Sequence, residues 1–183
     1  MPGGSHQYII GWPAKIASGR LCRVAQPGTS DADVHWLSAA VELSKRCSPS
    51  ATAFSVGAVL VGADGALLTD GYSRELDPAD HAEEVALAKI GLPAASGSGS
   101  VTGMAEATLY SSLEPCAART SRPAPCADLI IASGVGRVVI AWREPPIFVP
   151  GGGAARLRAA GVAVTTLPEL AHAARAVNAH LLR

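Results

Sequence analysis

The chain has 183 residues, enough for one domain with a sizeable hydrophobic core and too few for a second catalytic domain beside it. Hydrophobic residues make up 49% of the sequence and charged residues 16%, a composition that excludes disorder as the main state. Lysine plus arginine and aspartate plus glutamate number 15 each, so the formal net charge is zero. A neutral chain has no net field to attract a polyanion, and we therefore expect no nucleic-acid partner.

The apolar stretches of the sequence are short. The longest, such as residues 54–61 and 138–142, fall far below the roughly 20 residues that span a bilayer, so we expect no membrane partner. The N-terminus has neither a basic start nor an apolar run with a cleavage site, and four cysteines are too few for a disulfide scaffold. We therefore expect a cytoplasmic protein whose cysteines serve a metal or catalysis.

Residues 1–30 contain many Gly, Pro and Ser without a sustained period. We interpret them as an irregular N-terminal arm that precedes a single domain at residues 31–183. From Asp31 to near Cys47, apolar residues recur at helical spacing, and Ser30 or Asp31 is available to cap the first turn. The sequence therefore predicts that the domain opens with a helix.

The remainder of the chain alternates strands with helices. An apolar, β-branched segment at 54–61, the turn pair Asp64-Gly65 and a second apolar segment at 66–69 predict a hairpin. The later predicted elements are a helix at 80–90, a loop at 94–100, strands at 108–111, 137–142 and 162–165, and helices at 126–133, at 154–160 and from Pro168 onward. This order predicts an α/β fold with one mixed sheet and helices on both faces.

Three short motifs fall at the boundaries of predicted strands and helices. They are His81-Ala-Glu83, Glu114-Pro-Cys116 and Pro125-Cys126. A helix N-terminus favours thiolate over thiol, and one imidazole with two thiolates is a ligand set that suits Zn²⁺. Three protein ligands leave the fourth tetrahedral position open for water, which is typical of a catalytic zinc site. Glu83 is not needed as a ligand and is then placed to move protons.

Each of these residues also has an ordinary explanation. Asp80-x-x-Glu83 fits a helix-capping pattern, a single histidine is most often a surface or core residue, and single cysteines are most often buried thiols. The joint arrangement of the three motifs is the signature of the zinc deaminases. We therefore take His81, Cys116 and Cys126 as predicted metal ligands and Glu83 as the predicted catalytic residue.

On these residues the sequence resembles the cytidine-deaminase superfamily, from about Asp31 to the C-terminus, and is most similar to the riboflavin-biosynthesis pyrimidine deaminase domain. The resemblance also covers the segments 108–116, 122–126, 136–141 and 160–164. Most of the superfamily has two residues between its cysteines, whereas nine separate Cys116 from Cys126, and the riboflavin branch has a similarly long insert.

The resemblance implies a three-layer α/β/α sandwich around a five-stranded mixed sheet. It implies a Zn²⁺-dependent hydrolytic deaminase in which Glu83 carries the proton and ammonia leaves from a small-molecule aminopyrimidine. It further implies that the backbone at Ala82 holds a substrate carbonyl, that carbonyls just before Glu114, such as that of Ser112, receive the amine, and that the protein is a homo-oligomer, a dimer or a tetramer.

The expected substrate contacts depart from the riboflavin branch. Ala53 and Phe54 stand where that branch has Asn-Pro, Ala117 and Ala118 replace histidines, and residues 144–147 replace an Asp-Pro-Asn-Pro run. We predict that Ala53 and Phe54 contact substrate, although Phe54 and Trp142 also fit the core. Arg119 and Arg122 in the insert are predicted to bind a substrate phosphate through forked hydrogen bonds, the alternative being solvated loop residues.

Three other functions compete with the aminopyrimidine deaminase. A cytidine or deoxycytidylate deaminase uses the same site chemistry. A tRNA or DNA editor is disfavoured by the neutral charge and the few aromatic residues. A non-enzymatic protein stabilised by zinc would also keep the ligands, but a structural zinc has no use for Glu83.

Overall fold

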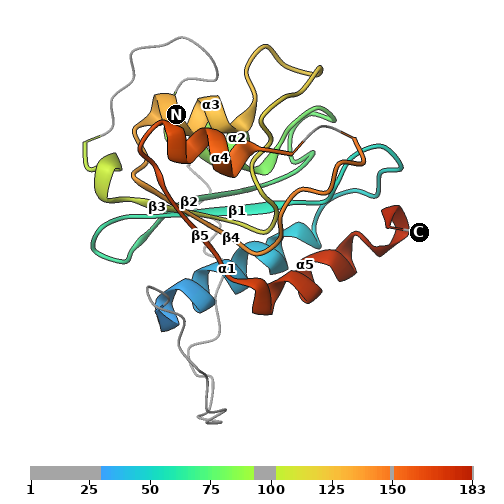
Figure 1. Cartoon of the computed structure of the whole chain (residues 1–183), viewed down its shortest axis with the longest axis horizontal. Coiled ribbons are helices and arrows are strands. Elements are labelled where there is room, and N and C mark those ends of the chain that lie inside the picture. The colour runs from blue at the N-terminus through green and yellow to red at the C-terminus, as the bar shows by residue number, and fades with distance from the viewer. Residues whose placement is uncertain (1–29, 93–101, 149–150, 183) are drawn as a thin grey trace, which may run out of the picture.

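A five-stranded mixed sheet forms the centre of the computed structural model, which describes residues 30–92, 102–148 and 151–182 (Figure 1). The strands are β1 (Gly57–Val61), β2 (Leu67–Tyr72), β3 (Thr108–Ser111), β4 (Arg137–Ile140) and β5 (Ala163–Thr166). Their order across the sheet is β2-β1-β3-β4-β5. Strand β1 is antiparallel to both β2 and β3, whereas β3, β4 and β5 are parallel.

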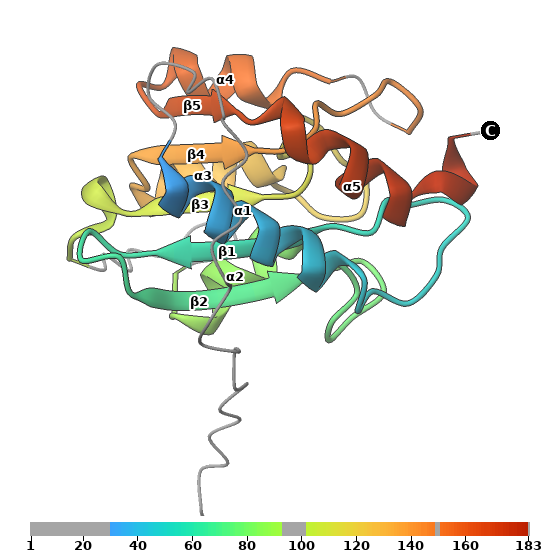
Figure 2. The ribbon, with the colours of Figure 1, turned by 90° about the horizontal axis from the view of Figure 1, so that it is seen from below.

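Helices cover both faces of this sheet. Helices α2 (Ala82–Lys89), α3 (Cys126–Ser133) and α4 (Gly153–Ala159) pack on one face, and α1 (Asp31–Ser44) and α5 (Ala171–Val177) pack on the other (Figures 1 and 2). Three short 3-10 helices complete the described part: η1 (Met104–Glu106), η2 (Pro168–Leu170) and η3 (Ala179–Leu181). The predicted three-layer α/β/α sandwich is therefore confirmed.

The sheet separates two apolar clusters because successive side chains of a strand point to opposite faces. In β3, Leu109 packs in the cluster beneath α2 and α3, and its neighbour Tyr110 packs in the cluster beneath α1. Both side chains are almost fully buried. The strands at the centre are buried on both faces, as expected of a sheet between two helical layers.

Helix α1 is fixed by a buried charge at its start. Ser30 is the N-cap, and Asp33 completes a capping box with it, as the sequence allowed. Asp33 also accepts hydrogen bonds from Tyr110 and, through both carboxylate oxygens, from Arg137. Burial alone would raise the pKa of Asp33, but the hydrogen bonds from Arg137, Ser30 and Tyr110 lower that pKa to about 2.

Several predicted boundaries shift in the structure. The first helix ends at Ser44 rather than near Cys47, the hairpin's second strand runs on to Tyr72, and the predicted strand at 137–142 ends at Ile140. The predicted helix after Pro168 is divided into η2, α5 and η3. The predicted loop at 94–100 and the N-terminal arm, except Ser30, lie outside the described residues.

The predicted strand at 54–61 begins only at Gly57, and the preceding residues have other partners. Ser55 donates its N–H to Asn178 Oδ1 at 2.7 Å, and Val56 donates its N–H to Ser73 Oγ at 3.2 Å. Side chains therefore accept from the N–H groups of Ser55 and Val56, whereas the Val56 carbonyl oxygen still accepts from the backbone N–H of Ser73 at 2.9 Å.

The described residues contain no helix that combines the length and the hydropathy of a membrane span.

Candidate active site

Two helix starts and one loop bring a histidine and two cysteines together. His81 is the N-cap of α2, Cys126 is the first residue of α3, and Cys116 lies in the loop after β3. The Nδ1 atom of His81 lies 3.6 Å from the Sγ atom of Cys116 and 3.4 Å from that of Cys126. The three ligand atoms all lie within 4.8 Å of one another, so these residues can share one metal ion.

Two glycines let the backbone approach this site closely. A Cβ atom at Gly71 in β2 would lie 2.6 Å from the carbonyl oxygen of Ala82, so glycine allows the start of α2 to pack on the sheet. A Cβ atom at Gly153 would collide with the carbonyl oxygen of Pro115, so glycine allows α4 to begin beside the cysteine loop. Contacts of 3.0 Å or less are not tolerated by real side chains.

The two thiols are electrostatically linked. The hydrogen bond from Cys126, aided by His81, lowers the pKa of Cys116 against the effect of burial. The same bond and burial raise the pKa of Cys126. Cys116 also accepts a hydrogen bond from the backbone N–H of Cys126 at 3.4 Å. One imidazole and two thiols, one of them already favouring the thiolate, form a donor set that fits Zn²⁺ and leaves a fourth position open.

Glu83 lies one residue into α2 and is only 3% exposed. Its Oε1 atom accepts a hydrogen bond from Ser111 Oγ at 2.8 Å. Burial is the main reason that the pKa of Glu83 is raised, with His81 acting in the opposite direction. The predicted Asp80-x-x-Glu83 capping box is not seen, because the Asp80 N–H donates to the carbonyl oxygen of Asp77 at 3.0 Å and the N-cap of α2 is His81, whose side chain makes no capping bond.

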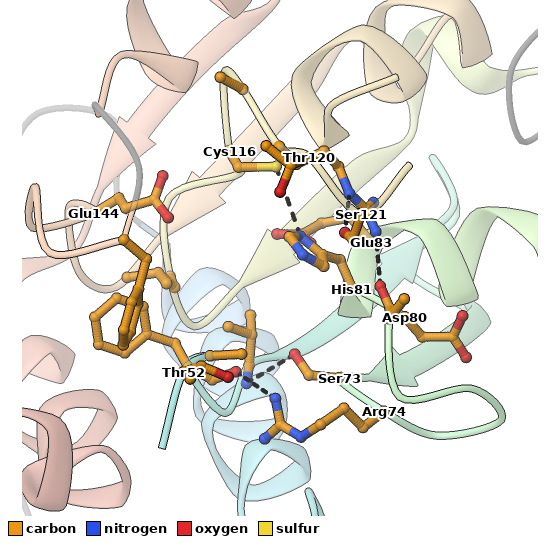
Figure 3. A pocket seen from close by; sticks show the side chains of 18 of the residues that line it. Thr52, Ser73, Arg74, Asp80, His81, Glu83, Cys116, Thr120, Ser121 and Glu144 are labelled. Atoms are coloured by element: carbon orange, nitrogen blue, oxygen red, sulfur yellow. Dashed lines mark hydrogen bonds between the residues drawn. The ribbon is translucent and has the colours of Figure 1, made fainter. Parts of the chain in front are cut away.

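A cavity of about 550 Å³ opens in front of His81, Glu83 and Cys116 (Figure 3). Its apolar side includes Phe54, which meets Trp142 and Phe148 edge to face with ring centroids 5.4 and 5.0 Å apart. Phe148 lines the cavity and Trp142 packs behind Phe54. The cavity thus joins a polar end at the predicted metal site to an aromatic wall.

Hydrogen bonds from two side chains hold the cavity wall at residues 52–56 in place. Asn178, which follows α5, accepts from the N–H of Ser55 at 2.7 Å and donates to its carbonyl oxygen at 3.0 Å. Arg74 donates to the carbonyl oxygen of Phe54 at 3.0 Å and to Ser55 Oγ at 2.9 Å. Arg74 also lines the cavity and has a φ of 61°, the one positive φ among the described non-glycine residues.

The arginines of the long insert are paired with carboxylates. Arg119 lines the cavity, but it donates to Glu84 at 2.9 Å and to the carbonyl oxygen of Ala79 at 2.7 Å, and its side chain is 2% exposed. Arg122 is absent from the described cavity lining and contacts Asp77 and Asp80 at 3.2 and 3.1 Å. Phosphate binding by these two residues stays a prediction, and carboxylates now compete with it.

Glu144 is a cavity residue that the sequence did not single out as functional. Its Oε2 atom is buried and has no hydrogen-bond partner among the described residues. Burial, together with the charges of Cys116, Glu83 and Glu114, raises the pKa of Glu144 to about 8. Figure 3 shows Glu144 on the side of the cavity away from Asp80. Glu144 is the first residue of the segment 144–147, which stands where the riboflavin branch has Asp-Pro-Asn-Pro. That departure is the sequence feature that could have drawn attention to Glu144.

The remaining predicted contacts either line the cavity or are chain neighbours of residues that line it. Ala53 and Phe54 line the cavity, and their contact with substrate stays a prediction. Ala82 is fully buried at the first turn of α2. Ser112 is buried next to the cavity residue Leu113, and its hydroxyl accepts from the N–H of Gly57 at 3.1 Å. The roles predicted for the Ala82 and Ser112 backbones stay predictions.

The fold and the metal ligands agree with comparisons to known proteins. The family described as the cytidine and deoxycytidylate deaminase zinc-binding region matches residues 30–142. A diaminohydroxyphosphoribosylamino-pyrimidine deaminase of Schizosaccharomyces pombe is 39% identical over 125 residues, which are 68% of this chain and 29% of that protein. The chain therefore belongs to the cytidine and deoxycytidylate deaminase family.

Solved structures support the same assignment. RibD of Acinetobacter baumannii is 32% identical with a TM-score of 0.66, covering 82% of this chain and 39% of that one. A C-terminal deletion mutant of Aspergillus oryzae Rib2 deaminase is 25% identical with a TM-score of 0.65, covering 82% of this chain and 99% of that one. The chain spans about a third of the length of the first curated relatives it matches, which are 29% and 34% covered.

Proposed function

We propose that this chain is a zinc-dependent hydrolytic deaminase that converts an amino group on a pyrimidine ring to a carbonyl and releases ammonia. The observation that carries the proposal is Glu83, a buried carboxylate that faces the same cavity as the His81, Cys116 and Cys126 set. A purely structural metal site does not require such a group. The family description and the names of the relatives support the same chemistry.

His81, Cys116 and Cys126 would hold the zinc ion. When bound, zinc acidifies a water molecule and so supplies a nucleophile near neutral pH. Glu83 would take one proton from the attacking water and deliver it to a ring nitrogen, and would then pass the remaining proton of the added oxygen to the departing amine as the carbonyl forms. The balance is one water consumed and one ammonia released, so no redox partner is required.

The cavity fits a flat, amino-substituted ring. Phe54 and Phe148 offer apolar surface to the ring faces, and the free oxygen of Glu144 can accept from an amino group or a ring N–H. In its protonated form Glu144 can instead donate to a ring carbonyl. These features support an aminopyrimidine of the kind named for the S. pombe relative, in a riboflavin-type or specialised pathway.

A cytidine or deoxycytidylate deaminase is the second candidate, and the family description favours it because it names both substrates. The two candidates share the reaction and differ in the ring substituents that the cavity accepts. The chain is proposed to act as one domain at residues 31–183, as a dimer or tetramer, on a small molecule. We place it in the cytoplasm, where a reducing environment keeps cysteines such as Cys116 and Cys126 available to a metal ion.

The test is a screen of the zinc-loaded protein for ammonia release. Aminopyrimidines with and without a phosphoribosyl group, cytidine and deoxycytidylate serve as substrates, and the metal-free protein serves as the control. We expect turnover of at least one aminopyrimidine and none without zinc. Ammonia from cytidine or deoxycytidylate alone would favour the second candidate, and no ammonia from any compound would contradict the deaminase proposal.

A further inference from the structure

Ser111 is a polar residue in an apolar position. It ends β3 and is 0% exposed, and in the sheet it pairs with Ala58 of β1 and Ile140 of β4, which are also 0% exposed. Both neighbours belong to the apolar cluster beneath α2 and α3. Burying a hydroxyl there is unfavourable unless the hydroxyl has a hydrogen-bond partner.

The partner of that hydroxyl is Glu83. The Ser111 Oγ atom donates to Glu83 Oε1 at 2.8 Å, and the bond joins the central sheet to the first turn of α2. Because the strand backbone is held by neighbours on both sides, the hydroxyl is a fixed point. One oxygen of the carboxylate is thereby anchored on the sheet, while Glu83 still lines the cavity.

We propose that Ser111 is a positioning residue that orients the Glu83 carboxylate for proton transfer at the cavity. This inference rests on the proposed deaminase function. A carboxylate that moves a proton must be held within a few tenths of an ångström and some tens of degrees of its working position, and a hydrogen bond from a rigid strand supplies that constraint. The bond acts on Glu83 and leaves the cavity wall unchanged, so its loss lowers kcat more than it raises KM.

The experiment compares Ser111→Ala with Ser111→Thr, which keeps the hydroxyl, and with the control Ser133→Ala. Ser133 is also buried, but its hydroxyl donates to the carbonyl oxygen of Ile130 rather than to a site residue. For Ser111→Ala we expect kcat to fall about ten- to a hundred-fold, with KM within about three-fold and full zinc content. Ser111→Thr should restore most of kcat, and Ser133→Ala should keep it.

A crystal structure of Ser111→Ala gives a second readout that needs no turnover. We expect the Glu83 carboxylate to rotate away from its wild-type orientation while the metal ligands stay in place. An unmoved Glu83 or a wild-type kcat in Ser111→Ala would overturn the proposal. Absence of wild-type ammonia release from every compound in the screen would reject the proposed function instead, and the orientation of Glu83 in the variant would still decide the role of Ser111.

Discussion

Glu83 has two physical explanations, and the structure separates them. A glutamate in the first turn of a helix often accepts a backbone N–H as part of a cap. Here the Asp80 N–H that a capping box would give to Glu83 donates to Asp77, and the Glu83 carboxylate accepts from Ser111 and faces the cavity. A buried carboxylate that is not used to cap its helix needs another reason to be there, and proton transfer supplies one.

The variant Glu83→Gln tests this reason. An amide has almost the same shape and can still bond to Ser111, but it cannot carry a proton. We expect the fold and the zinc content to persist while turnover falls roughly 100- to 10,000-fold or more. Steady-state ammonia release, thermal unfolding and metal analysis measure the three quantities. Turnover close to that of the wild type would return Glu83 to a structural role.

The metal set is tested by Cys116→Ala and Cys126→Ala. The sulfur atoms of both residues lie within 3.6 Å of the same histidine nitrogen, and three ligands are the minimum that a catalytic zinc site uses. Each variant should lose most of the approximately one zinc per chain that we expect in the wild type. Cys47→Ala is the control, because Cys47 bonds to the carbonyl oxygen of Val56 away from the ligand set. Full zinc in both ligand variants would show that the assignment is wrong.

At the residue scale, the sequence was sufficient where chemistry restricts residue type. Only a few side chains bind zinc, so His81, Cys116 and Cys126 stand out by identity and by their place at helix starts. Ser111 and Glu144 do not stand out, because a serine in a strand or a glutamate in a loop has many ordinary roles. Their relevance depends on what lies across from them in space: Glu83 for Ser111, and an open cavity for Glu144.

At the element scale, the helices and strands near the site were predictable, whereas the backbone conformation of the cavity wall at 52–56 was not. Hydrophobic periodicity places α2, β3 and α3, and these elements carry the metal ligands and Glu83. The wall at 52–56 is held by Asn178, more than 120 residues away along the chain. No local pattern encodes that contact, so the strand was predicted to begin three residues too early.

The variant Asn178→Ala should loosen this wall. Removing the amide leaves the buried N–H and carbonyl groups of Ser55 without their partner. Each buried group left without a hydrogen bond costs about 1 to 3 kcal/mol of folding free energy. We expect a lower free energy of unfolding in urea and a higher KM with a smaller change in kcat. His180→Ala is the matched control, since His180 bonds to the carbonyl oxygen of Ser50 at an exposed position. If both variants changed the unfolding free energy and KM equally, Asn178 would not be the residue that holds the cavity wall in place.

Helix α1 should make the protein sensitive to acid through Asp33. The folded-state pKa of Asp33 is lowered to about 2 from an ordinary value of 3.8, so its contribution to stability is complete above about pH 4 and is lost as the pH falls toward 2. Asp33→Asn should therefore reduce stability at neutral pH by roughly 1 to 2 kcal/mol and flatten the loss between pH 4 and 2. Urea unfolding across that range measures both, with the exposed Asp31→Asn as control. A wild-type pH profile in Asp33→Asn would contradict the assignment.

At the scale of the whole molecule, the distribution of charge limits what the cavity can bind. The insert between the cysteines provides Arg119 and Arg122, and the chain that precedes α2 provides Asp77 and Asp80, with Glu84 inside the helix. These opposite charges form ion pairs, which hold the insert between the cysteines against α2 and the residues before it. The pairing sets two guanidinium groups against three carboxylates, so it leaves no surplus positive charge and withdraws guanidinium groups that a substrate phosphate would otherwise use.

The variant Arg122→Ala tests whether Arg122 holds the insert in place through its ion pairs or binds a substrate phosphate. If Arg122 binds phosphate, the variant raises KM for a phosphorylated aminopyrimidine by roughly ten- to a hundred-fold and leaves the unphosphorylated compound unchanged. Because Arg122 contacts Asp77 and Asp80 and is absent from the described cavity lining, we expect instead that KM changes by less than about three-fold for both compounds. Kinetics on the matched pair of compounds measure this difference. A selective loss on the phosphorylated compound would mean that substrate displaces the carboxylates from Arg122, and the insert would then have to move when substrate binds.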